Sequence, residues 1–152
     1  MGIETLDDRR QGRMTKDGIR IYDREDFAGM HQAGALAARI LDEIAPLVVP
    51  GATTGEIDAA ITRMVEDAGA TSATIGYKGY QHASCISVNH VVCHGIPGDK
   101  RLKEGDILNV DVTVIVDGWF GDTSRMYAAG NLSRKAERLI QVTHDALFKG
   151  IE

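Results

Sequence analysis

Residues 107–127, ILNVDVTVIVDGWFGDTSRMY, limit the possible folds of this chain more strongly than any other segment. Two stretches of alternating apolar and polar side chains flank Asp117-Gly118, a dipeptide typical of a two-residue β-turn. Because such a turn fixes the register, the sequence predicts these cross-strand pairs: Val116 with Trp119, Thr113 with Asp122, and Asp111 with Ser124. The segment is therefore predicted to be an antiparallel hairpin.

The two faces of this hairpin differ in chemistry. One face is apolar and is assigned to the core: Leu108, Val110, Val112, Val114, Val116, Trp119 and Tyr127. The other carries short oxygen-bearing side chains: Asn109, Asp111, Thr113, Asp122 and Ser124. Asp111 and Asp122 are diagonal neighbours there, so their carboxylates could meet at one divalent cation. The alternative is that both carboxylates are solvated or accept hydrogen bonds from the backbone.

Two carboxylates do not complete a catalytic metal site, because such sites use three or more protein ligands. The ligand types that follow Asp122 lie on or beside the last predicted helix: Glu137, His144, Asp145 and Glu152. None of them lies in a strand facing the hairpin. The sequence therefore supplies too few ligands for a complete site.

Three segments outside the hairpin predict amphipathic helices. They begin at these capping patterns: Asp23 with Asp26, Thr53 with Glu56, and Asn131-Leu-Ser133. The apolar stripes are Phe27, Met30, Gly34, Ala37, Ile40, Leu41 and Ile44 in the first; Ile57, Ile61, Met64 and Val65 in the second; and Ala136, Leu139, Ile140, Thr143, Ala146 and Leu147 in the third. Between the second and third helices, β-branched runs that include 86–88 and 91–92 predict further antiparallel strands.

These elements predict an α+β fold in which two antiparallel helices pack on an antiparallel sheet. The chain has 152 residues, of which 43% are hydrophobic, which suits one compact domain. We expect residues 1–22 to form a polar N-terminal arm and residues 23–152 to form the domain.

Charge and hydropathy exclude some classes of ligand. The formal net charge is -5 and no basic run is longer than a pair, so we expect no nucleic-acid specificity. No stretch of about 18 apolar residues and no apolar leader occurs, so we expect a cytoplasmic protein without membrane attachment. In a reducing compartment, both cysteines are expected to be free thiols or metal ligands.

The segment 85–97, CISVNHVVCHGIP, holds both cysteines and two of the five histidines. One reading is a structural zinc site, built from two x2-spaced pairs: His82 with Cys85, and His90 with Cys93. A second makes Cys93 a nucleophile with His94 as its base, although adjacent strand residues point to opposite faces. In the third, which we favour, the cysteines line a wall and His94, at the end of its strand, faces the carboxylate cleft.

Two segments together resemble type I methionine aminopeptidases, which have the pita-bread fold. They are GYKGYQHASCISVNHVVCHGIP and LKEGDILNVDVTVIVDGWFGDTSRMY, and the resemblance extends over the adjacent helices, from about residue 23 to the end. It implies that the chain is the first half of that fold plus the first helix of the second half. It also implies a site of two divalent metal ions, of Co, Mn, Fe or Zn.

The resemblance carries several roles onto residues of this chain. Asp111 and Asp122 match two metal-ligand aspartates of the family, and His94 matches a histidine that contacts substrate and assists catalysis. Tyr77, Tyr80 and Cys85 match residues that line the pocket for the methionine side chain. Position 74, often cysteine in the family, is threonine here. The family's other metal ligands, one histidine and two glutamates, have no counterpart in this sequence, so we expect a truncated or split form.

The function implied is removal of the N-terminal methionine from nascent proteins by metal-dependent hydrolysis. We expect the 152-residue chain to have little or no activity by itself. Expected partners are N-terminal methionine peptides and nascent chains. The ribosome and a second copy, bound through the exposed surface of the half-fold, are further candidate partners. The alternatives are a non-catalytic binding module and a related proline-specific aminopeptidase.

Overall fold

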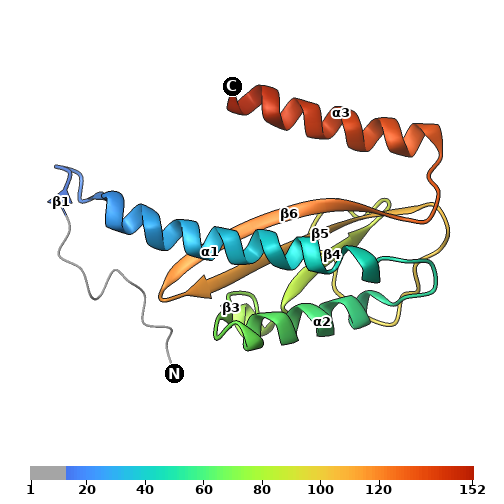
Figure 1. Ribbon diagram of the computed structural model, residues 1–152, viewed down its shortest axis with the longest axis horizontal. Helices are drawn as coiled ribbons and strands as arrows, with labels where there is room; N and C mark the ends of the chain where they lie inside the picture. The colour runs from blue at the N-terminus through green and yellow to red at the C-terminus, as the bar shows by residue number, and fades with distance from the viewer. Residues whose placement is uncertain (1–12) are drawn as a thin grey trace.

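The computed structural model describes residues 13–152 and has an α+β architecture (Figure 1). Helices α1 and α2 pack on one face of a four-stranded antiparallel sheet, and α3 lies away from both of them (Figure 1). Residues 13–22 of the predicted arm carry a small antiparallel pair, β1 (Arg13–Met14) and β2 (Arg20–Ile21). Residues 1–12 lie outside the described part. No helix among residues 13–152 could cross a membrane.

Helix α1 (Arg24–Glu43) begins as predicted, with Asp23 and Asp26 forming a reciprocal capping box. Its predicted stripe is wrong at the N-terminal end, where Phe27 and Met30 are 61% and 48% exposed. The face that meets the sheet there carries small residues instead, because the helix backbone approaches β6 closely. A Cβ on Gly29 would collide with the ring of Trp119, so no larger side chain fits at this contact.

Helix α2 (Thr54–Asp67) runs antiparallel to α1 (Figure 1). The predicted capping box is present: the backbone N–H of Glu56 donates to the Thr53 hydroxyl, and the backbone N–H of Thr53 donates to the Glu56 carboxylate. The helix ends before Gly69, which adopts a left-handed φ of 67°. A short 3-10 turn, η2 (Ala45–Leu47), connects the two helices.

The sheet is organised around one long hairpin. β5 (Asp106–Val116) pairs along its whole length with β6 (Trp119–Ala129). β3 (Thr71–Ser72) and β4 (Ser84–Val88) pair with different stretches of β5. The observed register confirms every pair predicted from the turn: Val116 with Trp119, Thr113 with Asp122, and Asp111 with Ser124. Asp117 and Gly118 both have positive φ, as a type I′ turn requires.

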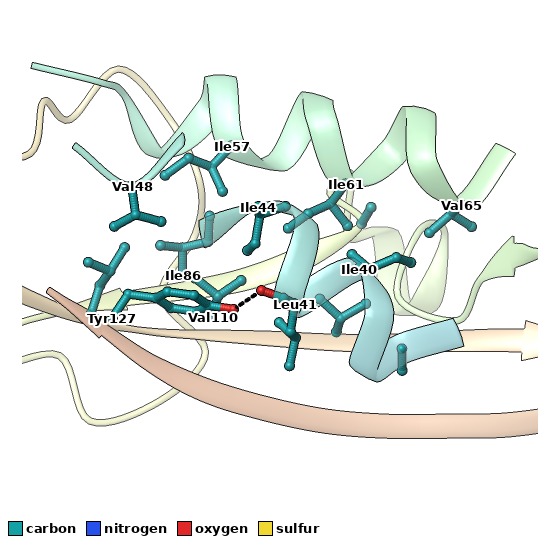
Figure 2. Close-up of a cluster of buried hydrophobic side chains, with 14 of the residues drawn as sticks. Ile40, Leu41, Ile44, Val48, Ile57, Ile61, Val65, Ile86, Val110 and Tyr127 are labelled. Atoms are coloured by element: carbon teal, nitrogen blue, oxygen red, sulfur yellow. Dashed lines mark hydrogen bonds between the residues drawn. The ribbon is translucent and has the colours of Figure 1, made fainter. Parts of the chain in front are cut away.

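The core lies between the helices and the predicted apolar face of the hairpin (Figure 2). Ile40, Leu41 and Ile57 from the helices meet Ile86 and Val110 of the sheet, and all are nearly inaccessible to solvent. The hydroxyl of Tyr127 donates to the carbonyl oxygen of Leu41, so a buried hydrogen bond joins α1 to β6 (Figure 2). The opposite face of the sheet is left for the polar side chains. We call it the open face.

Two sequence expectations are corrected. Helix α3 (Arg134–Ile151) begins at Ser133 as predicted, but none of its residues is buried, so its apolar stripe does not join the core. Val91 and Val92 do not form a strand, and Val92 is 92% exposed. The chain leaves the sheet at Asn89, which has a left-handed φ of 56° and whose side-chain oxygen accepts the Ile107 N–H at the beginning of β5.

Candidate active site

Asp111 of β5 and Asp122 of β6 lie on the open face. Their cross-strand partners are Ser124 and Thr113, which places the two aspartates as diagonal neighbours. The hydroxyl of Thr113 donates to Asp122 Oδ1 at 3.0 Å and thereby orients that carboxylate. Asp111 is half-buried and Asp122 is exposed. The alternating pattern of the hairpin therefore brings the two predicted carboxylates to one surface.

The electrostatic state of Asp111 reflects this arrangement. Burial raises the pKa of its carboxyl above the ordinary value, and repulsion from the Asp122 carboxylate raises it further, whereas the nearby His94 imidazole lowers it. The charges of Asp122 and His94 thus both affect the Asp111 carboxyl. A half-buried carboxylate beside a second one is stabilised by a cation, which is the environment expected of a metal-ligand pair.

The loop that carries His94 is held against the edge of β4. The backbone N–H of Ile86 donates to the Gly95 carbonyl at 2.8 Å, and the Gly95 N–H donates to the Ser87 hydroxyl at 3.1 Å. A Cβ on Gly95 would lie 2.2 Å from the carbonyl oxygen of Ile86, so only glycine fits. The expectation that His94 ends a strand is wrong: it lies in this loop, exposed, with a left-handed φ of 54°.

Cys85 and Tyr80 lie beside the carboxylates. Cys85 is the direct cross-strand partner of Asp111, on the side of β5 opposite Ser124. Its Sγ donates to Tyr80 Oη at 3.6 Å, and the Tyr80 hydroxyl donates to the Ser84 carbonyl at 2.8 Å. Burial raises the pKa of Tyr80, with the Cys85 hydrogen bond and the charge of Asp58 adding to the effect, so the phenol remains protonated. The two residues form one wall, called here the Tyr80–Cys85 wall.

Tyr77 is placed differently from the other predicted pocket residues. It begins the 3-10 turn η3 (Tyr77–Gly79), in which Lys78 has a left-handed φ of 49°. Its carbonyl accepts the backbone N–H of Tyr80 at 2.9 Å, but the residue is 65% exposed and its ring lies under the Lys78 ammonium. The backbone therefore brings Tyr77 near the wall, while its ring faces outward.

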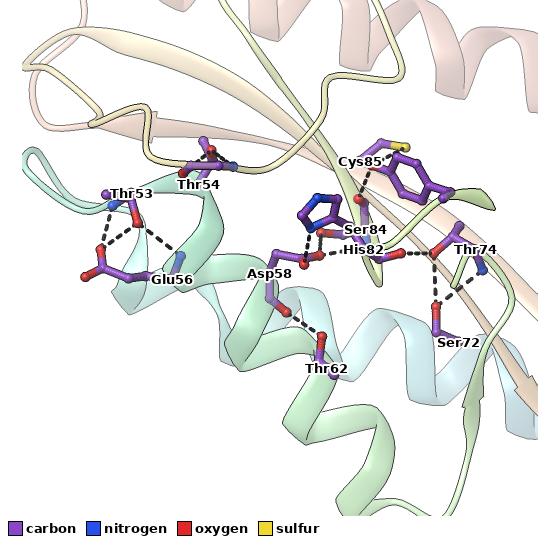
Figure 3. A network of polar contacts seen from close by, with 12 residues as sticks. Thr53, Thr54, Glu56, Asp58, Thr62, Ser72, Thr74, His82, Ser84 and Cys85 are labelled. Carbon is purple, nitrogen blue, oxygen red and sulfur yellow. Dashed lines mark hydrogen bonds and ion pairs between the residues drawn. The ribbon is translucent and has the colours of Figure 1, made fainter. Parts of the chain in front are cut away.

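Threonine at position 74 has a structural partner. Its hydroxyl donates to the His82 carbonyl at 2.7 Å and lies 3.0 Å from the Ser72 hydroxyl (Figure 3). These contacts close the segment between β3 and β4 on itself. The threonine that stands at position 74, where the family often has cysteine, therefore stabilises this segment.

Sequence reasoning missed one residue, Asp58 of α2, which is buried and contacts both His82 and Ser84 (Figure 3). A signal existed, because Asp58 follows Ile57 and precedes Ile61 on the stripe that faces the core. A carboxylate in that position needs polar partners. Its partners, however, are at least 24 positions away in the sequence.

The donor set fits part of a metal site. Asp111 and Asp122 present hard oxygen ligands on one face, the type that divalent cations accept. Among residues 13–152, however, no group of three or more His, Cys, Asp or Glu side chains is arranged to hold a metal ion. The same finding argues against a zinc site built from His82, Cys85, His90 and Cys93. Both cysteines are free, and Cys93 is exposed, so it does not line a wall.

Comparison with known proteins shows the family. The model of metallopeptidase family M24 matches residues 28–152. The chain belongs to this family. A methionine aminopeptidase of Rickettsia prowazekii is 52% identical over 134 residues, which are 88% of this chain and 52% of that protein. This chain thus spans about half the length of the curated relatives it matches.

Solved structures confirm the pita-bread fold. A crystal structure of the methionine aminopeptidase from Rickettsia prowazekii matches with a TM-score of 0.86 and 52% identity, over 88% of this chain and 54% of that one. The prolidase from Pyrococcus furiosus matches with a TM-score of 0.72 but only 19% identity, over 83% of this chain and 36% of that one. The second likeness shows the fold alone. The first agrees with the type I resemblance seen in the sequence.

Proposed function

We propose that this chain supplies two metal ligands, an assisting histidine and a side-chain pocket to a metal-dependent aminopeptidase that removes N-terminal methionine. The relative at 52% identity is named a methionine aminopeptidase. The observation that carries the proposal is the placement of Asp111 and Asp122 on the open face, with Cys85 directly beside Asp111. Expected substrates are peptides and nascent chains that begin with methionine, encountered in the cytoplasm.

The carboxylates would hold the cation. Burial and the charge of Asp122 both disfavour ionised Asp111, and a divalent cation between them would offset both effects. Thr113 keeps Asp122 oriented toward the shared face. We propose two ions per complete site, of Co, Mn, Fe or Zn. When bound, they would polarise the scissile carbonyl and make water a better nucleophile at neutral pH.

The remaining residues would bind and orient the substrate. The Tyr80–Cys85 wall offers an aromatic edge and a polarisable sulfur, surfaces that suit a thioether side chain. Tyr77 would complete the pocket by turning its exposed ring inward. His94 is held by the contacts of Gly95 with β4. Its imidazole would form a hydrogen bond with the substrate backbone and would carry a proton at that position.

By itself the 152-residue chain should have little peptidase activity. Two carboxylates are fewer than the three or more protein ligands that catalytic sites use, and residues 13–152 arrange no further group around them. The same ligand shortage favours the second candidate, a module that binds N-terminal methionine without cleaving it. The aminopeptidase and the binding module would both use the Tyr80–Cys85 wall, but only the aminopeptidase would release methionine.

The test uses the purified 152-residue chain with Mn²⁺ or Co²⁺ and two short peptides, one beginning with methionine and one with alanine. We expect the methionine peptide to perturb the amide resonances of residues 77–94 at lower concentration than the alanine peptide, with no measurable release of methionine. Equal perturbation by both peptides would argue against a methionine pocket. Sustained turnover would show that the ligands already present suffice.

A further inference from the structure

Asp58 ties α2 to the beginning of β4. Only 6% of its surface is exposed, and its side chain points at the first residue of that strand (Figure 3). Its Oδ1 accepts the Ser84 backbone N–H at 2.9 Å and the Ser84 hydroxyl at 2.7 Å. Its Oδ2 lies 3.0 Å from His82 Nδ1. A buried carboxylate with three donors holds them firmly, because losing one of them would leave its charge with fewer compensating hydrogen bonds.

Ser84 and His82, the two residues that contact the Asp58 carboxylate, also contact Tyr80. The Ser84 carbonyl accepts the Tyr80 hydroxyl, and the His82 ring meets the Tyr80 ring edge-on, with centroids 5.5 Å apart. Tyr80 Oη in turn accepts the Cys85 thiol. A continuous chain of contacts therefore runs from Asp58, on the core side of the sheet, to the Tyr80–Cys85 wall on the open face.

Backbone hydrogen bonds fix the first part of the segment that precedes β4: the Ala73 N–H donates to the Thr113 carbonyl of β5, and the Gly76 N–H donates to the Tyr80 carbonyl. Residues 73–83 belong to no strand, and their helical structure is limited to the turn η3. Ser84 is the cross-strand partner of Val112 in β5. Its backbone N–H donates to the Asp58 carboxylate, and its carbonyl accepts the Tyr80 hydroxyl. Side-chain contacts therefore take the place of ladder hydrogen bonds here. A binding wall carried on such a segment needs a supporting layer to hold its geometry.

We propose that Asp58 is a positioning residue for the Tyr80–Cys85 wall and that it acts through Ser84 and His82. Assigning this wall to a methionine side chain depends on the proposed function above, whereas the link from Asp58 to the wall does not. The competing explanation is that Asp58 only fastens α2 to the sheet. In that case its loss would lower global stability without changing the position of Tyr80 and Cys85.

The experiment measures access to Cys85. In a Cys93→Ser background, labelling by N-ethylmaleimide at one fixed pH reports on Cys85 alone. Asp58→Asn keeps the shape of the side chain but removes its charge and one of its acceptor oxygens. Tyr80→Phe removes the hydroxyl that Ser84 and Cys85 both contact, so it tests the far end of the same chain of contacts. Urea unfolding is followed for every variant.

Tyr127→Phe is the matched control. It removes another buried hydrogen bond between a helix and the sheet, the one to Leu41, without touching the wall. We expect Asp58→Asn and Tyr80→Phe to speed Cys85 labelling by about fivefold or more, and Tyr127→Phe to change it by less than about twofold at a similar loss of stability. Unchanged labelling in Asp58→Asn, or an equal rise in Tyr127→Phe, would overturn the positioning role.

A second measurement separates this inference from the proposed function. L-Methioninamide and L-alaninamide are titrated into the parent chain and into Asp58→Asn, and binding is followed by amide resonances. Weaker binding of methioninamide by Asp58→Asn, with faster Cys85 labelling, supports both ideas. If the parent chain does not prefer methioninamide, the methionine pocket is wrong, while the labelling result still decides the role of Asp58. If the parent chain does prefer methioninamide, faster labelling of Asp58→Asn with unaltered methioninamide binding would overturn positioning of a binding wall.

Discussion

Gly121 of β6 lies directly against the carbonyl oxygen of Ala33 in α1, and a Cβ at position 121 would come within 2.2 Å of that oxygen. The contact is between two backbones, so neither a rotamer change nor a flexible side chain can relieve it. Because Asp122 follows Gly121, the same contact sets where one of the two carboxylates stands. The close packing of α1 therefore contributes to the geometry of the open face.

Gly121→Ala should destabilise the chain by about 2–3 kcal/mol, since overpacking against backbone forces the helix and strand apart. Gly34→Ala is the matched control, because a Cβ at Gly34 in the middle of α1 meets nothing within 4 Å. It should stabilise the chain by about 0.5–1 kcal/mol through higher helix propensity. Urea unfolding measures both changes, and a tolerated alanine at 121 would contradict the close approach.

Asp111→Asn should have opposite effects on metal affinity and on stability. It should weaken Mn²⁺ or Co²⁺ binding at least about tenfold, because one charged oxygen ligand is lost. It should also make the metal-free chain more stable, because burial and the neighbouring Asp122 both disfavour its charge. Calorimetric titration and urea unfolding give the two numbers.

Asp117→Asn is the control for that experiment. Asp117 lies in the turn of the same hairpin with a φ of 48°, which asparagine also tolerates. It should leave both metal affinity and stability unchanged. If it weakened metal binding as much as Asp111→Asn, the effect would come from net charge rather than from the open face.

The capping box of α2 should give the chain a defined acid sensitivity. The backbone N–H and hydroxyl of Thr53 lower the pKa of the Glu56 carboxyl, with burial opposing and Arg101 assisting. A carboxyl whose pKa is lower in the folded state stabilises the fold above its unfolded pKa, and this contribution is lost as pH falls through the folded value. Parent and Glu56→Gln should therefore differ in urea midpoint near about pH 6, and this difference should shrink as the pH falls below about 4.3, the ordinary pKa of a glutamate.

Glu66→Gln, at an exposed position later in the same helix, serves as the comparison for the cap. Its effect on the urea midpoint should be smaller at neutral pH, because Glu66 takes no part in the capping box. The mechanism would be contradicted if the difference in urea midpoint between the parent chain and Glu56→Gln became larger as the pH is lowered.

Helix α3 should be the least protected helix of the chain. It buries no residue, and Leu139, Val142 and Leu147 are each more than half exposed. A helix without tertiary packing is marginal in water, so its amides should exchange at least about a hundredfold faster than those of α1 or β5. Hydrogen exchange at low protein concentration measures this.

Concentration dependence tests whether the same stripe associates. Exposed apolar side chains favour pairing between copies, so protection of α3 that rises with protein concentration, together with a larger species in gel filtration, would indicate self-association. Strong protection of the α3 amides from hydrogen exchange, in a chain that stays monomeric, would contradict the exposed position of the helix.

Local signals in the sequence determined where elements begin and how the hairpin is registered. Asp23, Thr53 and Ser133 cap helices because their side chains reach N–H groups two or three residues away. Asp117-Gly118 set the pairing of Asp111 and Asp122 because a two-residue turn leaves the flanking strands one register. These interactions span few residues, so a single sequence is enough to predict them.

Tertiary structure decided everything that depends on distant partners. His94 is placed by Gly95 folding back onto Ile86, and Asp58 contacts Ser84 across 26 positions of sequence. The outward position of Phe27 follows from small residues of α1 facing β6. The exposure of α3 follows from its position away from the core, where residues 13–152 bury none of its side chains. Which apolar stripe is buried, and which loop approaches a carboxylate, depends on the surfaces that meet in space. Periodicity gives the direction in which a side chain points but not what lies there.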